Sequence, residues 1–125
     1  MVFWIYSNLI LGMLIVTNSA SSELLRQSIS RGSPGEVYVH LQPDKFEEGW
    51  MFLRVSAWNN SGIPIARTDG LTVYAPESQK SLLDGLTIDH YQDLTGGGFL
   101  ISTPIGAVKS TCGSGFKFLK TDGVL

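Results

Sequence analysis

The sequence predicts an α+β domain that is mainly β, with one N-terminal helix packed on a compact, twisted arrangement of short strands. Three observations predict this class. Fourteen glycines and five prolines among 125 residues favour many turns and short elements. Short runs of alternating apolar and polar residues recur along most of the chain. A long helical pattern occurs once, near the start, and a flexible glycine-rich tail that bears Cys112 is expected at the C-terminal end.

Composition and charge narrow the class of function. Hydrophobic residues make up 43% of the chain and charged residues 16%, which is typical of a globular protein. The net charge is −2 and no basic stripe is visible, so nucleic acid is not expected as a partner. A single cysteine excludes an intramolecular disulfide and any zinc site built on paired cysteines.

The first sixteen residues are apolar and uncharged, and two interpretations of them stay open. In the first, the domain begins near Met13 and residues 1–12 are an extension or a mis-set start. In the second, residues 1–16 form a signal or membrane segment of a membrane-tethered or secreted domain. The run is shorter than the roughly 20 residues of a spanning helix, and no basic residue precedes it. We therefore expect a cytoplasmic protein, with anchoring through residues 1–16 as the alternative.

A short strand and a capped helix are predicted next. Residues 14–16 are a strand-like run, and Thr17 or Asn18 can cap a helix by accepting from the free N–H groups of its first turn. Glycine and proline within residues 31–35 end the helix. Three apolar side chains of the helix are expected to pack inward: Leu24, Leu25 and Ile29.

Alternating patterns predict the strands that follow. In residues 36–43 the alternation places Val37, Val39 and Leu41 on one face. Asparagine and glycine within residues 59–62 predict a tight turn, and residues 75–83 predict a short helical turn after a proline. The six predicted strands span residues 36–43, 50–58, 63–66, 71–74, 86–89 and 99–101.

Cys112 is the candidate metal ligand. Glycines at 113 and 115 remove side chains around it and let backbone N–H groups approach. A thiolate is the species that binds metal, and nearby donors stabilise its charge. A lone cysteine is also compatible with a small buried core residue, but the polar, glycine-flanked surroundings favour an exposed thiol.

Residues 83–118 carry a series of short motifs that resemble one family. Together with the strand–cap–helix opening, they are similar to the A-type iron–sulfur carriers, also called the HesB/IscA-like or iron–sulfur biogenesis domain family. The resemblance covers residues 13–118 and leaves residues 119–125 as a tail. The motifs are Leu83-Asp84-Gly85, Ile88-Asp89-His90, Gly96-Gly97-Gly98-Phe99, Thr103-Pro104 with Ala107, and Cys112-Gly113-Ser114-Gly115.

The resemblance implies a homodimeric, non-enzymatic iron–sulfur assembly or carrier protein. Its implied cofactor is an iron–sulfur cluster or iron, and its implied partners are iron–sulfur assembly or recipient proteins. Members of the family use three cysteines, whereas this chain keeps only Cys112: the turn over residues 43–49 has none, and Ser114 stands at the third position. One chain cannot supply the four ligands, mostly thiolates, that clusters need. Two chains and an external thiol such as glutathione can.

Two interpretations of the lost cysteines remain open. The chain is either a carrier with reduced or altered cluster binding through Cys112, or a metal-free interaction or scaffold paralogue on the same fold. The retained glycines fit both, because the turns need them whether or not metal binds.

Overall fold

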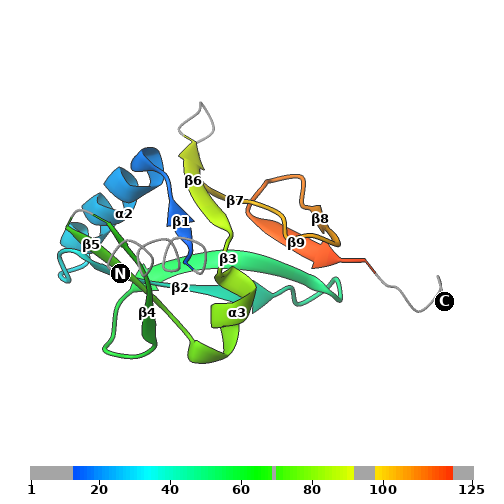
Figure 1. The fold of residues 1–125 in the computed structure, drawn as a ribbon, viewed down its shortest axis with the longest axis horizontal. Helices are drawn as coiled ribbons and strands as arrows, with labels where there is room; N and C mark the ends of the chain where they lie inside the picture. Colours follow the sequence, from blue (N-terminus) through cyan, green and yellow to red (C-terminus); the bar gives the residue numbers. More distant parts are fainter. Residues whose placement is uncertain (1–12, 69, 92–97, 120–125) are drawn as a thin grey trace, which may run out of the picture.

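The predicted α+β, mainly β class is confirmed by the computed structural model, which describes residues 13–68, 70–91 and 98–119. Figure 1 shows one long helix and a set of short, twisted strands. The elements in chain order are β1 (Ile15–Val16), α2 (Asn18–Ser30), β2 (Glu36–Pro43), β3 (Trp50–Ala57), β4 (Ile63–Thr68), β5 (Leu71–Ala75), the 3₁₀ turn η1 (Glu77–Gln79), α3 (Lys80–Leu83), β6 (Thr87–Tyr91), β7 (Gly98–Ile101), β8 (Ala107–Lys109) and β9 (Gly115–Phe118).

The strands form two sheets around the long β2–β3 hairpin. One sheet has the order β4-β5-β2-β3-β9-β8, and the other has the order β1-β6-β7. β5 pairs with β2 at Glu36–Tyr38, near one end of the hairpin, and β9 pairs with β3 at Trp50–Phe52, near the other. In Figure 1, helix α2 and the hairpin β8–β9 accordingly lie at opposite ends of β2 and β3.

The core lies between the two sheets and helix α2. Val37, Val39 and Leu41 are buried, as the alternation in β2 predicts, and Phe116 of β9 is fully buried beside them. Beyond its pairing with β5, strand β2 has a stretch of edge that one side chain closes. The Gln79 side chain accepts from Leu41 N at 2.8 Å and donates to Leu41 O at 2.9 Å, in place of a neighbouring strand.

A cap fixes the start of α2 and ties it to β6. Thr17 has extended backbone and its Oγ1 accepts from Ala20 N at 3.2 Å, which satisfies a free N–H group of the first turn. The same hydroxyl donates to Asp89 Oδ1 at 2.7 Å, and His90 N donates to that oxygen at 2.8 Å. The bond from Thr17, followed by that from His90, lowers the pKa of Asp89, because both stabilise the carboxylate.

The prediction that Ile29 packs inward is wrong. Its side chain is 58% exposed, and Ser28 takes the buried position one turn after Leu24. Ser28 is accommodated because its Oγ donates to Leu25 O at 2.7 Å and accepts from Gly35 N at 2.8 Å. The chain returning from the helix therefore needs a polar side chain there, which overrides the apolar pattern.

The segment that carries Cys112 is not part of a tail. It forms the hairpin β8–β9, which extends the larger sheet beside β3 and was not predicted as strands. Gly115 explains the close approach, because a Cβ there would lie 2.5 Å from Met51 O. Strands of three and four residues give little alternation to detect, and their pairing is with a distant part of the chain.

Several predictions concern residues outside the described ranges. These are the apolar segment 1–12, most of the tail 119–125, and Gly96 and Gly97 of the triple glycine. Over the part of the chain that the structure describes, no helix combines the length and the apolar character needed to cross a membrane.

Replacing Thr17 with Val should remove the cap and the bond to Asp89 together. We expect the free energy of unfolding in urea to fall by about 1 kcal/mol, the usual worth of an N-cap. Because the folded-state pKa of Asp89 is depressed, the bond stabilises the fold above the unfolded pKa of about 4 and is lost as pH falls through the folded pKa. The difference between wild type and variant should therefore shrink on acidification.

The matched control is Thr72→Val, on β5, whose hydroxyl makes no hydrogen bond within the described residues. Equal unfolding free energies for Thr17→Val and Thr72→Val at neutral pH would contradict the role of the cap.

Candidate functional site

The candidate site is the five-residue loop, residues 110–114, that joins β8 to β9. The loop closes through Ser110 N to Gly115 O at 3.0 Å and Gly113 N to Ser110 O at 3.1 Å. Gly113 has a φ of +80°, and a Cβ there would lie 2.7 Å from Leu100 Cδ2. The loop therefore needs glycine at 113 for its backbone, and a Cβ there would in addition displace the end of the Leu100 side chain.

This loop joins the two sheets. Gly113 O accepts from Ile101 N of β7 at 2.9 Å, and Ser114 O accepts from Leu53 N of β3 at 2.8 Å. Two successive carbonyls thus bind strands of different sheets, which fixes Cys112 immediately before them. Cys112, the predicted functional thiol, therefore lies on a hydrogen-bonded loop and not at a free chain end.

The Cys112 thiol is exposed and lies between two hydroxyls. Its Sγ is 3.0 Å from Ser114 Oγ and 3.4 Å from Ser110 Oγ. Ser110 Oγ also accepts from Gly115 N at 3.1 Å, so its own hydrogen is available to the sulfur. These hydroxyls, Ser110 first, lower the pKa of Cys112 because they stabilise the thiolate, and partial burial opposes them only in part.

Cys112 borders a groove of about 680 Å³ between the two sheets. Strands β3 and β7 form its walls, and the loop closes one end. Two residues of this site were missed by the sequence reasoning. One is Ser110, which the symmetric spacing Ser110-Thr111-Cys112-Gly113-Ser114 signals; the other is Arg54 of β3, which lines the groove and which no local pattern marks.

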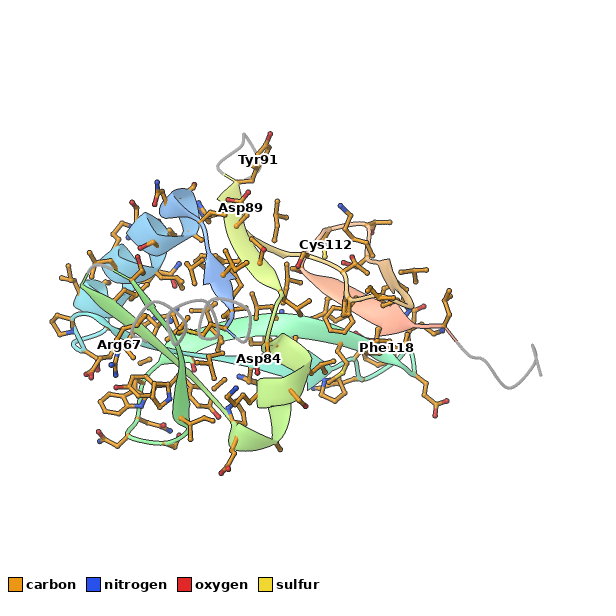
Figure 2. All side chains as sticks on the ribbon, viewed as in Figure 1. Arg67, Asp84, Asp89, Tyr91, Cys112 and Phe118 are labelled. Carbon is orange, nitrogen blue, oxygen red and sulfur yellow. The ribbon has the colours of Figure 1, made fainter. Side chains whose placement is uncertain are left out.

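The turn over residues 43–49 lies away from Cys112. Glu47, Glu48 and Gly49 line a hollow with Lys117 and Phe118, at the far end of β9. Figure 2 shows Cys112 and Phe118 at opposite ends of that strand. At about 3.3 Å per residue, β9 separates the two loops by on the order of 10 Å. The structure therefore does not bring the turn that lacks a cysteine together with the thiol.

Other residues of the predicted motifs have structural roles. Asp84 pairs with Lys80 at 2.6 Å, and Gly85 adopts a φ of +84° in the turn before β6. The ring of His90 packs against Phe99 with centroids 5.1 Å apart. Within the described ranges, no three His, Cys, Asp or Glu side chains gather in a group that could hold a metal ion.

Ser114→Ala should raise the pKa of Cys112, because the thiolate loses one of its hydroxyl donors. The rate of alkylation by iodoacetamide, measured against pH, should show its midpoint shifted upward. Ser81→Ala, at an exposed position on α3, serves as the matched control and should leave the midpoint unchanged. An unchanged or lower midpoint in Ser114→Ala would show that Ser114 does not stabilise the thiolate.

The fold is shared with solved proteins of iron–sulfur metabolism. The crystal structure of IscA with the [2Fe-2S] cluster superposes with a TM-score of 0.71 at 24% identity, covering 86% of this chain and 100% of that one. Escherichia coli SufA, involved in biosynthesis of iron–sulfur clusters, gives 0.54 at 18% identity, covering 74% and 86%. No family model and no curated protein matches the sequence. The chain therefore has the fold of IscA and SufA, as the resemblance implied.

Proposed function

We propose that this protein is an iron–sulfur cluster or iron carrier that binds its cargo through Cys112 and is not an enzyme. The observation that carries the proposal is the thiol itself: exposed, with a lowered pKa, and fixed by the loop that joins the two sheets. The fold is that of IscA, whose crystal structure contains a [2Fe-2S] cluster.

The chemistry of the thiol supports metal binding. A thiolate ligates iron, and a thiol with a lowered pKa has more thiolate at neutral pH. Exposure lets a second molecule reach the sulfur. Hydroxyls of Ser110 and Ser114 beside the sulfur supply hydrogen bonds of the kind that tune bound clusters.

The number of ligands sets the oligomeric state that we propose. Clusters take four ligands, mostly thiolates, and one chain supplies one. Two copies supply two, and an external thiol such as glutathione supplies the rest. Ser114, at the position where the resembled family has its third cysteine, is a poor ligand by comparison, so binding is weaker or altered. We therefore propose a homodimer in the loaded state, with iron–sulfur assembly or recipient proteins as partners.

Anaerobic reconstitution tests the carrier proposal. Wild-type protein mixed with ferric iron, sulfide and glutathione should gain visible absorbance from thiolate-to-iron charge transfer, and light scattering should show a dimer. Cys112→Ala should lose both changes. Ser114→Cys, which adds a second thiol beside the first, should raise the cluster yield, while Ser81→Ala should match wild type.

Visible absorbance that is absent, or that is the same in Cys112→Ala, would sink the carrier proposal. The single remaining cysteine would then favour the second candidate function, a metal-free interaction or scaffold protein on the same fold.

We also propose that residues 13–118 form the functional domain, in the cytoplasm. β1 is anchored just after Met13, because Ile15 N donates to Leu86 O at 2.8 Å and Gly85 N donates to Met13 O at 3.2 Å. A protein that starts at Met13 should unfold in urea with the same free energy as the full chain, since the core is retained. Aggregation of the shortened protein, or recovery of the full chain in a membrane fraction, would contradict this.

A further inference from the structure

We infer that the groove beside Cys112 binds an extended segment of a partner protein, held between the open edges of β3 and β7. The inference extends the proposed function in one respect, because it assigns to that segment a cysteine that completes the ligand set at Cys112. Binding of the segment in the groove depends on the backbone groups of β3 and β7 and does not require a metal ion.

Strand β3 has an open edge beyond β9. Asp44 N donates to Trp50 O at 2.9 Å, which fixes the antiparallel alternation of the β2–β3 hairpin. By that alternation, Leu53 and Val55 direct their N–H and C=O groups away from β2. The strand pairing of β3 with β9 ends at Phe52, and Leu53 N donates to Ser114 O at 2.8 Å just beyond it. Further along β3, the outward backbone groups of Val55 have no partner among the described residues.

Strand β7 faces the same space with a second open edge. Ser102 N donates to Thr87 O at 2.9 Å, so Ile101 and Phe99 direct their backbone groups away from β6. Ile101 N donates to Gly113 O at 2.9 Å. Two residues earlier, the outward backbone groups of Phe99 have no partner within the described ranges.

The loop shows what kind of ligand fits these edges. Gly113 and Ser114 give one carbonyl to β7 and one to β3. One step further along each strand, Phe99 and Val55 offer equivalent groups across a groove of about 680 Å³. An extended polypeptide can continue the same hydrogen bonding, which is the mode of strand addition at exposed sheet edges. Its side chains would meet a mixed lining, in which polar residues stand beside four apolar ones: Leu53, Val55, Phe99 and Leu100.

Charge and direction specify the segment further. Among the described residues that line the groove, Arg54 is the one with a charged side chain. Its Nε donates to Gln42 Oε1 at 3.1 Å at an exposed position, and the other guanidinium N–H groups can meet a carboxylate of the partner segment. A strand that continues the place of β9 runs antiparallel to β3, and its C-terminal end then arrives at Ser114, beside Cys112. A cysteine near that end stands next to the Cys112 thiol.

Peptide binding to the metal-free full chain tests the groove. The probe is an N-acetylated, C-amidated nonapeptide of alternating Thr and Val, with Cys at its eighth position and Asp at its ninth. In ¹H–¹⁵N spectra we expect saturable shifts of the Val55 and Phe99 amide signals. The same peptide with alternate backbone nitrogens methylated should not bind, because it cannot pair with the edges.

Charge reversal gives the decisive variant, because Arg54 is exposed and its replacement should leave the fold intact. Arg54→Glu should weaken the Asp peptide about tenfold and strengthen a Lys version by a similar factor. Arg67→Glu, an equally exposed change on β4, should alter neither affinity. Val55→Pro removes the outward N–H while keeping an apolar side chain of similar size, and should also abolish binding. If Val55→Pro does not fold, the peptide affinities of Arg54→Glu are sufficient to test the proposal.

Three results would overturn the groove. The first is that amide signals shift only for residues outside the groove. The second is that the methylated peptide binds as tightly as the unmethylated one. The third is that Arg54→Glu leaves the affinities of the Asp and Lys peptides unchanged. The cysteine is tested separately by adding ferric iron and sulfide: cluster absorbance should be higher with the Cys peptide than with its Ser version, and equal absorbance would refute the role of the cysteine. Peptide binding without metal is independent of the carrier proposal, so failure of one is distinguishable from failure of the other.

Discussion

Two adjacent carbonyls, those of Gly113 and Ser114, hold the two sheets together on the side of the molecule where the candidate chemistry lies. One accepts from β7 and the other from β3, and Cys112 precedes them directly. The position of the thiol, the closed end of the groove and the start of β9 all follow from this contact. It requires glycine on both sides of Ser114, since a side chain at 113 would meet Leu100 and one at 115 would meet Met51.

The same contact changes how the glycines around Cys112 are understood. From the sequence they suggested access for a metal and for backbone donors. In the structure their measurable role is to let the loop and β9 approach β7 and β3. Access to the thiol comes from its position at the turn, and the pKa of Cys112 is lowered first by the hydroxyls of Ser110 and Ser114 and then by the backbone N–H groups of Ser114 and Cys112. Ser114 takes part both in the packing of the loop and in the chemistry of the thiol, because its carbonyl binds β3 and its hydroxyl stabilises the thiolate.

Much of the fold could be predicted from local pattern, because the signals were local. The alternation in β2, the cap at Thr17 and the proline before η1 each depend on a few neighbouring residues. The predictions failed where a distant contact decides. Ser28 is buried where its hydroxyl accepts a hydrogen bond from Gly35 N. The hairpin β8–β9 forms where β9 pairs with β3. The groove could not be predicted at all, since β3 and β7 are brought together only by the folded topology.

Gln79 makes the two edges of the β2–β3 hairpin differ in their ability to accept a further strand. Its amide occupies both hydrogen-bonding groups of Leu41, so this stretch of β2 cannot recruit a foreign strand. The stretch of β3 at Val55, across the same hairpin, has no such side-chain plug among the described residues. Along the β2–β3 hairpin, strand addition is therefore closed at Leu41 of β2 and open at Val55 of β3.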